Sequence, residues 1–288
     1  MRKTEQGLNK GLPIGVRRTI SYIVLAMMCV MCLVWFYILI INSTRSRGEL
    51  TAGFTPIPST YLIKNFINLR DTSGLPIVRG MINSIVIATL SATLSVYFST
   101  MTAYAIHAYR FKGRKLIFTF ILGIMTIPTQ VTALGFVQMI SNAGLMDSYL
   151  PLVLPSIAAP AVFFYMKQYM DSSLPHSLIE AARIDGASEF RTFNTIALPL
   201  MKPAIAVQAI FSFVASWNNY FVPALVLHKD RMKTLPILIA QLRSADFLKF
   251  DMGQVYVMIL FSIAPVIVVY LILSKHIIGG LTVGGVKG

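Results

Sequence analysis

Six long stretches of this sequence contain no charged residue, and they limit the folds open to the chain more than any other feature. A helix needs about 20 residues to cross the roughly 30 Å hydrocarbon core of a bilayer. It also satisfies its backbone hydrogen bonds within one segment, whereas runs this long do not fit the short alternating strands of a barrel. Because 56% of the residues are hydrophobic and only 12% are charged, we expect an all-α integral membrane protein. Its six predicted transmembrane helices are 19–41, 81–106, 116–140, 148–166, 203–227 and 252–274.

The basic residues predict which segments face the cytoplasm, where loops are enriched in Lys and Arg. With the N-terminus inside, the inner segments hold 15 Lys and Arg residues and the outer segments hold 10. The clearest contrast is between "HAYRFKGRK" (107–115), with four basic residues, and "SNAGLMD" (141–147), with none. The predicted organisation begins with a cytoplasmic N-terminal tail (1–18) and, after the first helix, an extracytoplasmic segment (42–80). A helical core (81–274) and a cytoplasmic C-terminal tail (275–288) follow.

Two other interpretations of the basic and apolar residues are disfavoured. The net charge of +14 is explained by basic cytoplasmic loops, so we expect no nucleic-acid partner. The first apolar stretch follows Arg17 and Arg18, as in a signal peptide, but it is too long for the apolar region of a signal peptide. No small-x-small cleavage site follows it, so we expect a retained helix.

The motifs that the sequence lacks exclude several mechanisms. No GxxxxGK[ST] motif is present, so the chain should not bind ATP through a P-loop. No Asp, Glu, Lys, Arg or His lies inside any of the six stretches, which disfavours an ion-coupled carrier. The four histidines are scattered and form no nucleophile–base or metal-ligand pattern. We therefore expect no enzyme active site, no cofactor and no metal site in this chain.

The polar residues inside the stretches are mostly amides and hydroxyls. Amides can hydrogen-bond between helices or contact a solute such as a sugar, and the sequence does not decide between these roles. The amides concerned are Gln130, Gln138, Gln208, Asn218 and Asn219.

A charged insert, 167–202, separates two of the apolar stretches, and its core is "EAARIDGASEFRTFNTIALPLMKP" (180–203). We expect one short helix capped by Ser172 or Ser173, with Pro175 in its first turn, and ended by Gly186 in a left-handed conformation. Helical spacing places Leu178, Ala181, Ala182 and Asp185 along one side of it.

A second short helix should follow, with Ser188 as its N-cap and Glu189 in its first turn. Phe190 and Phe193 should share an apolar stripe in it, and Pro199 should end it. The helix–Gly–helix element would be either a solvated amphipathic connector or a helix that docks into a groove of a soluble partner.

The motifs of the insert and of the chain around it resemble a known family. Glu180-Ala181-Ala182, Asp185-Gly186-Ala187 and Ile196-Ala197-Leu198-Pro199 resemble the "EAA" loop of the permease subunits of binding-protein-dependent ABC importers. The segments that are similar to the carbohydrate branch, and to its maltose-transporter-type second and shorter permease, are "NSIVIA" (83–88), "TAYAIHAYRFKGRK" (102–115), "IPTQV" (127–131), "SWNNYFVPALVL" (216–227), "TLPILIAQL" (234–242) and "GLTVGGVKG" (280–288).

The resemblance implies a function and a set of partners. The chain would be the membrane-spanning subunit of an ATP-driven sugar importer of the bacterial cytoplasmic membrane, with oligosaccharide as the expected solute. It would pair with a sister permease, bind two cytoplasmic ATPases that hold the ATP, and receive solute from an extracytoplasmic binding protein. The same architecture could instead import glycerol phosphate or a polyol, and a carrier without ATPases is the less favoured alternative.

The resemblance also implies site residues. The residues that would couple the subunit to an ATPase are Glu180, Ala181, Ala182, Asp185 and Gly186. The residues of the C-terminal tail that would also contact the ATPases are Gly284, Gly285, Val286 and Lys287. The outer loop 228–251 would face the binding protein. Asn218-Asn219 departs from the family, where Asn followed by an acid is more usual. The resemblance names no substrate-binding residues.

Overall fold

The computed structural model describes residues 13–71, 74–244 and 251–284. Every regular element in these ranges is a helix or a helical turn. The contacts divide the chain into two units. Unit 1 comprises 1–69 with 251–260, and unit 2 comprises 70–250 with 261–288.

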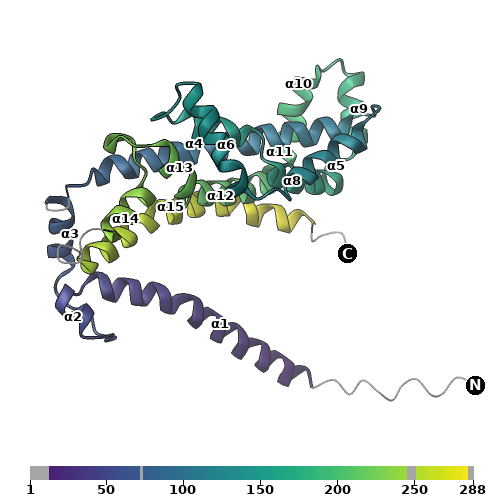
Figure 1. Cartoon of the computed structure of the whole chain (residues 1–288). Helices are drawn as coiled ribbons and strands as arrows, with labels where there is room; N and C mark the ends of the chain where they lie inside the picture. The colour runs from purple at the N-terminus through teal and green to yellow at the C-terminus, as the bar shows by residue number, and fades with distance from the viewer. Residues whose placement is uncertain (1–12, 72–73, 245–250, 285–288) are drawn as a thin grey trace, which may run out of the picture. The chain divides into compact units, whose positions relative to one another are not determined.

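Unit 1 contains α1 (Ile14–Ser43), α2 (Arg47–Thr51), most of α3 (Leu62–Asp71) and the start of α15 (Met252–Gly284) (Figure 1). The side chains of α1 from residue 14 to 37 are exposed although they are mostly apolar, as expected for a helix surrounded by lipid. Beyond α1, the buried Arg45 donates to the backbone oxygens of Glu49 and Gly53. Asn65 Nδ2 donates to the backbone oxygens of Ser43 (3.0 Å) and Arg45 (2.9 Å). These bonds tie the segment between α1 and α3 into an ordered structure.

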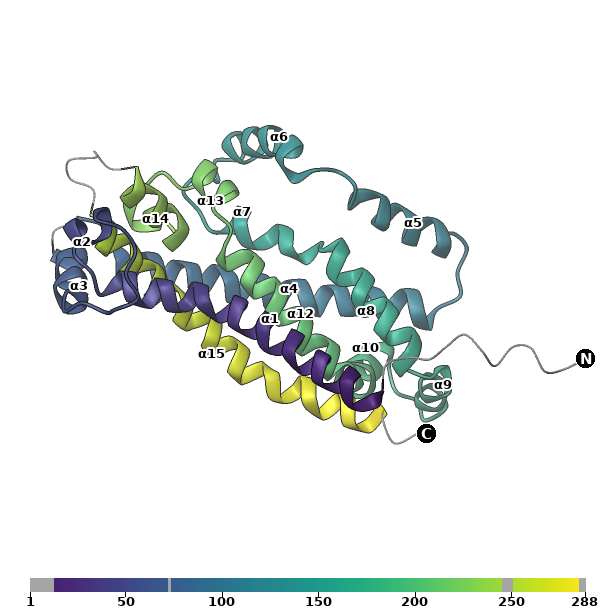
Figure 2. The same ribbon diagram turned by 90° about the horizontal axis from the view of Figure 1, so that it is seen from below.

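Unit 2 is organised around α4 (Ile77–Ala108), and α8 (Pro160–Ser173) and α12 (Lys202–Trp217) pack along it (Figure 2). The buried face of α4 is lined by small side chains, which let neighbouring helices approach closely. Ser91 Oγ donates to the backbone oxygen of Leu152 (3.5 Å) and Ser99 Oγ donates to that of Ala159 (3.3 Å). These hydroxyls hold the proline-broken stretch that leads into α8, which consists of α7 (Leu150–Val153) and the 3₁₀ turn η1 (Leu154–Ile157).

One predicted transmembrane stretch is sharply bent, and a second sharp bend directly precedes another predicted stretch. The stretch 116–140 forms α5 (Arg114–Ile124) and α6 (Thr129–Asn142), which meet at 94°. Before α12, the segment of α10 (Glu189–Thr192), the π-helical turn η2 (Phe193–Ala197) and α11 (Leu198–Leu200) meets α12 at 81°. The remainder of the predicted stretch 203–227 contains the separate short helix α13 (Phe221–Val226).

The number of membrane crossings depends on how the bent pairs are counted. Four helices of the described chain are long and apolar enough to cross a membrane, and six would do so if each bent pair were one crossing. The all-helical membrane architecture is thus confirmed, whereas the count of six stays a prediction. The first and last helices of the chain extend beyond the predicted stretches, since α1 begins at Ile14 and α15 continues past residue 274 to Gly284.

The end of unit 2 that carries α13, the 3₁₀ turn η3 (Asp230–Met232) and α14 (Leu235–Arg243) is attached to the first turns of α4. Asn83 Nδ2 donates to the backbone oxygens of Arg231 (3.0 Å) and Lys233 (2.9 Å). The backbone N–H of Leu235 donates to Ser84 Oγ (2.8 Å). The described part of the predicted outer loop is therefore held against α4 through its backbone.

Candidate functional site

The charged insert forms α9 (His176–Ile184), a turn at Gly186, and α10. Figures 1 and 2 show α9 and α10 side by side at the end of unit 2 where α4 and α8 also end. In both views α6, α13 and α14 lie toward the opposite end of this unit.

Gly186 ends α9 as the sequence predicts. Its φ is +75°, a left-handed conformation that residues with a Cβ rarely adopt. The N–H of Gly186 donates to the oxygen of Arg183 (3.1 Å) and the N–H of Ala187 donates to that of Ala182 (2.9 Å). This pair of bonds is a Schellman motif, which satisfies carbonyl groups left free at the end of the helix. Ser188 then caps α10 by accepting from the N–H of Arg191 (3.3 Å), also as predicted.

The start of α9 differs from the prediction. The N-cap position is Pro175, with no side-chain cap, and neither Ser172 nor Ser173 caps the helix. Both serines still belong to α8, and Ser172 Oγ donates back to the oxygen of Tyr169 (2.8 Å). The prediction was wrong because α8 continues almost to α9, so the serines are committed to the preceding helix.

The end of the second helix also differs. The chain remains helical through Pro199 and turns only at Met201. The turn η2 has π-helical bonding, in which the N–H of Leu198 donates to the oxygen of Phe193. A wider turn of this kind accommodates a proline ring that an α-helix would exclude.

The four residues that the sequence places along one side of α9 do not all lie on the same side. Ile179 and Ala182 of α9 are buried, whereas Leu178, Ala181 and Asp185 are exposed, so Ala182 lies on a different side from the other three predicted residues. Two apolar side chains that the prediction did not place outward are strongly exposed: Ile184 is 86% exposed and Phe190 is 67% exposed.

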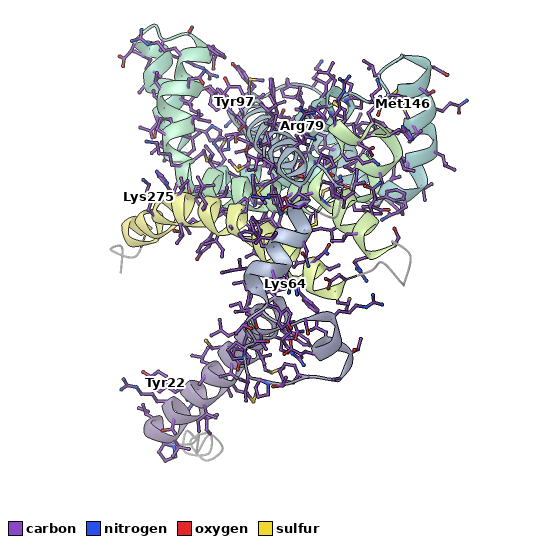
Figure 3. All side chains as sticks on the ribbon, turned by 90° about the vertical axis from the view of Figure 1, so that its left-hand side faces the viewer. Tyr22, Lys64, Arg79, Tyr97, Met146 and Lys275 are labelled. Atoms are coloured by element: carbon purple, nitrogen blue, oxygen red, sulfur yellow. The ribbon has the colours of Figure 1, made fainter. Side chains whose placement is uncertain are left out.

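Phe190 and Phe193 do not share a stripe. Phe193 is 2% exposed and contacts the rings of Tyr97 (centroids 5.7 Å apart) and Tyr104 (5.5 Å) on α4. Tyr97, labelled in Figure 3, also donates from its hydroxyl to Asn194 Oδ1 (3.3 Å). Because α4 covers only the side of the segment that carries Phe193, Phe190 is left outside.

An ion pair closes the turn between α9 and α10. Arg183 Nε donates to Glu189 Oε1 (2.7 Å), and Tyr104 Oη donates to Glu189 Oε2 (3.2 Å). The guanidinium of Arg183 also lies over the ring of Tyr109, 5.2 Å from its centroid. The hydrogen bond with Glu189 raises the pKa of Arg183. We name Arg183, Glu189, Tyr104 and Tyr109 the clamp, because they join α9, α10 and the C-terminal end of α4.

A second, more buried network anchors the start of α9. Lys167 Nζ on α8 donates to both carboxylate oxygens of Asp171 (2.5 Å), and Asp171 Oδ1 lies 2.8 Å from His107 Nδ1 on α4. His107 Nε2 lies 2.9 Å from the oxygen of Leu174, which precedes α9. The ring of His176 stacks on that of His107, with centroids 4.3 Å apart. Burial, followed by the charge of His107, lowers the pKa of His176.

Glu180 lies beside a cavity of about 430 Å³ between α9 and the end of α4. The cavity is also lined by Arg110, His176, Arg183 and Glu189. The carboxylate of Glu180 is exposed and makes no ion pair with a described residue, so it is available to a partner.

The predicted site residues therefore have different positions. Glu180, Ala181, Asp185 and Gly186 are exposed on or next to α9, and Ala182 is buried beneath them. Gly284 is the last residue of α15, whereas Gly285, Val286 and Lys287 lie outside the described residues. The exposure of Ile184 and the contacts of the clamp were not predicted from the sequence. Ile184 could have been found, since it continues the i, i+3 spacing of Leu178 and Ala181. Within the ranges described, no three His, Cys, Asp or Glu residues are grouped as metal ligands would be.

Comparison with known proteins places these features in a family. Residues 95–281 match the family model described as "Binding-protein-dependent transport system inner membrane component". The arabinooligosaccharides transport system permease protein AraQ of Halalkalibacterium halodurans is 38% identical to the chain, over 87% of the chain and 89% of that protein. The trehalose/maltose transport system permease protein MalG of Thermococcus litoralis is 31% identical, over 93% and 95% of the two proteins.

A third relative has a different kind of solute in its name. The sn-glycerol-3-phosphate transport system permease protein UgpE of Escherichia coli is 30% identical, over 85% of the chain and 89% of that protein. Among solved structures, a chain of a bacterial ABC transporter involved in the import of the acidic polysaccharide alginate superposes with a TM-score of 0.77 at 21% identity. The match covers 93% of this chain and 99% of that chain, and it supports the fold described above.

Proposed function

Since the chain belongs to the family of inner membrane components of binding-protein-dependent transport systems, we propose that it is the permease subunit of an ATP-driven oligosaccharide importer. In this proposal it forms the translocation path with a sister permease and couples the path to cytoplasmic ATPases through α9. The chain has no P-loop motif, so in this proposal the ATP is bound by the ATPase subunits. Both termini lie in the cytoplasm, and a solute-binding protein delivers solute on the other side of the membrane.

The observation that carries the coupling role is the apolar outer side of α9. Leu178 and Ile184 are 41% and 86% exposed, and the small Ala181 lies between them in the sequence and is also exposed. A solvated connector would expose polar side chains at these positions, whereas a helix that enters the groove of another protein presents apolar anchors at this spacing. The exposed carboxylate of Glu180 would meet a basic group of the same partner.

The two anchoring networks explain how movement of α9 would reach the membrane helices. The clamp joins α9 to α4 through Glu189 and Tyr104. The network of His107, Asp171 and Lys167 joins α9 to α4 and α8. A push on α9 when two ATPases close on ATP would therefore move α4 and α8 together with it, as in a rigid-body switch. The tail residues Gly284, Gly285, Val286 and Lys287 would provide a second contact with the ATPases.

The solute class is proposed from the relatives. AraQ and MalG are both named for the transport of oligosaccharides or disaccharides. The second candidate is glycerol phosphate, which is favoured by the similarity to UgpE. A carrier that works without ATPases is less favoured, because the predicted transmembrane stretches contain no Asp, Glu, Lys, Arg or His.

The coupling role is tested by reversing the charge of Glu180. Glu180→Lys should weaken the binding of the ATPase subunits by about tenfold or more, since a hydrogen bond to a charged group contributes about 1.5–3 kcal/mol. The measurement is the ATPase stoichiometry of the complex purified through a tag on this chain, together with solute uptake in proteoliposomes. Asp230→Lys, an equal reversal on an exposed residue of η3, is the control and should leave the stoichiometry unchanged. Full stoichiometry and uptake in Glu180→Lys would contradict the coupling role.

A further inference from the structure

The connection from α4 to α5 carries a cluster of positive charge that the proposed function leaves without a role. It runs from just after Ala108, the last residue of α4, into the first turn of α5, and it can be followed in Figure 2. Its four basic residues are Arg110, Lys112, Arg114 and Lys115, and we name residues 110–115 the basic turn. With Phe111, Gly113 and Leu116 they line an open hollow of about 560 Å³, and no acidic residue lines it.

The positive charges of the basic turn have no partner in the described chain. Two other basic side chains near this end of unit 2 are paired, Lys167 with Asp171 and Arg183 with Glu189. By contrast, no hydrogen bond or ion pair joins a side chain of 110–115 to any residue that the structure describes. The turn therefore offers a concentrated positive charge to a molecule from outside the chain.

The basic turn lies at the depth of the lipid headgroups. The rest of α5, "LIFTFILGI" (116–124), contains no charged residue. One side of it packs on α8, where the ring of Phe118 lies 5.9 Å from that of Phe163. The other side carries the exposed Phe120 and Leu116, which is 74% exposed. An uncovered apolar side of a membrane helix faces lipid chains or another membrane subunit, so charged residues at the start of the helix lie where the hydrocarbon ends.

The hollow combines two chemical properties that a phospholipid matches. Basic clusters directly beside a membrane helix bind the phosphate of anionic lipids. Phe111 and Leu116 add exposed apolar surface to the same hollow, which suits the first part of the lipid chains. An inorganic phosphate ion would bind only the basic groups. A soluble protein would reach those groups from the aqueous side, but not the apolar side chains beside the hydrocarbon.

The hollow is open to a headgroup. Gly113 has a φ of +90°, and a Cβ at this position would meet no atom within 4 Å. The side chains of Arg110, Lys112 and Lys115 are exposed. Glu180 lines only the neighbouring cavity, which shares Arg110 with the hollow, and it forms no ion pair with Arg110. A headgroup can therefore reach the basic groups without displacing a described acidic side chain.

We propose that the basic turn, together with Phe111 and Leu116, is a docking surface for the headgroup of an anionic phospholipid of the surrounding membrane. The proposal goes beyond the proposed function, since it concerns neither the solute nor the contact with an ATPase. Because the turn directly follows Tyr109 of the clamp, a bound lipid would hold α4 where it meets the coupling segment.

The test uses the complete complex, purified through a tag on this chain and reconstituted in liposomes. The liposomes contain equal parts of phosphatidylglycerol, which is anionic, and phosphatidylcholine, which has no net charge. A photoreactive benzophenone side chain replaces that of Phe111, so that illumination attaches it to the molecule that occupies the hollow. Mass spectrometry then identifies the attached molecule and gives the ratio of the two lipids.

Two pairs of substitutions test the role of the charges. Lys112→Gln with Lys115→Gln removes two of the four charges, and neither residue lines the cavity beside α9. Lys112→Arg with Lys115→Arg keeps the charges. The matched control is Lys64→Gln with Arg79→Gln, which removes the same charge from exposed residues of the predicted extracytoplasmic segment.

The expected result is preferential attachment of phosphatidylglycerol when all four basic residues are present. The preference should fall by about fivefold or more in Lys112→Gln with Lys115→Gln, because each basic residue near an anionic surface strengthens binding by about fivefold. The Arg pair and the control should keep the preference. Added salt should lower it, since exposed charges are screened.

Four outcomes would overturn the proposal. Two are equal attachment of the two lipids with all four charges present, and an unchanged preference in the Gln pair. Attachment to an ATPase subunit in place of lipid would assign the turn to a protein partner. Loss of the lipid product with inorganic phosphate, but not with chloride of the same ionic strength, would assign it to a soluble ion. If the Gln pair does not assemble with its ATPases, the lipid preference and its salt dependence with all four charges present decide.

Discussion

The two ends of unit 2 are both attached to α4, but by different kinds of contact. At the coupling end, which is α9, Gly186 and α10, a side chain of α4 binds a side chain, since Tyr104 Oη donates to Glu189 Oε2 (3.2 Å). At the loop end, which is residues 144–147 and 228–243, the side chain of Asn83 on α4 binds the backbone oxygens of Arg231 and Lys233. Within the loop end, Asp147 likewise accepts from the backbone N–H groups of His228 (2.6 Å) and Lys229 (2.8 Å).

The two ends should therefore tolerate different substitutions of their side chains. Backbone groups are the same in every residue, so the loop end can change its own side chains and stay in place. Side-chain pairs depend on both partners, so the coupling end requires the residues it has. Under the proposed function, the loop end would meet the solute-binding protein and the coupling end would meet an ATPase, and two ends with such different partners would be expected to differ in this way.

The largest predicted effect comes from substituting two glycines, one at each end of unit 2. Gly186 at the coupling end has φ +75° and Gly144 at the loop end has φ +67°, and a Cβ at either position would meet nothing within 4 Å. Replacing either with Val should strain the backbone by about 1–3 kcal/mol and lower the thermal stability of the complex similarly. Only Gly186→Val should also lower ATP-dependent uptake, by about tenfold.

This prediction is checked by melting temperature and uptake in the same preparations. Equal loss of uptake in Gly144→Val would mean that the strain acts through general folding and not through the position of α9. Failure of Gly186→Val to insert in the membrane would have the same meaning.

A smaller effect is expected from replacing the carboxylates of Asp147 at the loop end and Glu189 at the coupling end. Asp147 has a positive φ of 55°, so Asp147→Gly removes the carboxylate without strain. It removes the acceptor of two backbone N–H groups that belong to exposed residues and can bind water instead, so the cost should be about 0.5–1.5 kcal/mol, and hydrogen exchange in 228–243 should become faster. Glu189→Gln should cost only about 0.2–1 kcal/mol, because both the glutamate and Arg183 are more than a third exposed.

Asp147→Gly should cost more stability, whereas Glu189→Gln should have the larger effect on transport. Glu189→Gln should lower the solute transported per ATP, since the clamp joins α9 to α4, and Asp147→Gly should leave the ATPase stoichiometry intact. If the Glu189→Gln complex transports as much solute per ATP as the unaltered complex, the clamp does not transmit the movement of α9 to α4.

The smallest effect is a dependence on pH confined to the coupling end. The pKa of His176 is lowered from its ordinary value of 6.5 by burial, by His107 and by Arg110 and Arg114, and Glu180 opposes the shift. The folded state thus favours the neutral ring, and the resulting stability is present above about pH 6.5 and declines as the pH falls below it. The hydrogen-exchange protection of 174–187, corrected for the slower intrinsic exchange at lower pH, should therefore decrease between pH 7.5 and 5.5.

The loop end provides the contrast in this experiment. The pKa of Asp147 is lowered from 3.8, chiefly by its bond from the N–H of Lys229, so its stabilising charge is retained above pH 4 and declines only in stronger acid. His176→Gln should remove the response of 174–187 to pH. A response of the same size at residues 228–243 would contradict the assignment to His176.

The sequence alone determined the features that depend on neighbouring residues. The charge-free stretches require helices in a membrane because each helix bonds its own backbone. Gly186 and Ser188 end and begin their helices through bonds to residues at most five positions away. Such contacts form whatever the rest of the chain does, so their residues could be predicted.

Only the tertiary structure decided which faces are buried and where the helices bend. Ala182 lies inward and Phe190 outward because of where α4 runs beside them, and no spacing within 167–202 contains that information. Glu189 meets Tyr104, 85 positions away, and Asp171 meets His107, 64 positions away. The bends after Ile124 and at Met201 likewise depend on packing, since a proline permits a bend but its neighbours in space set the angle. Contacts between distant residues form only when the whole chain has folded, and for this reason the clamp was visible only in the structure.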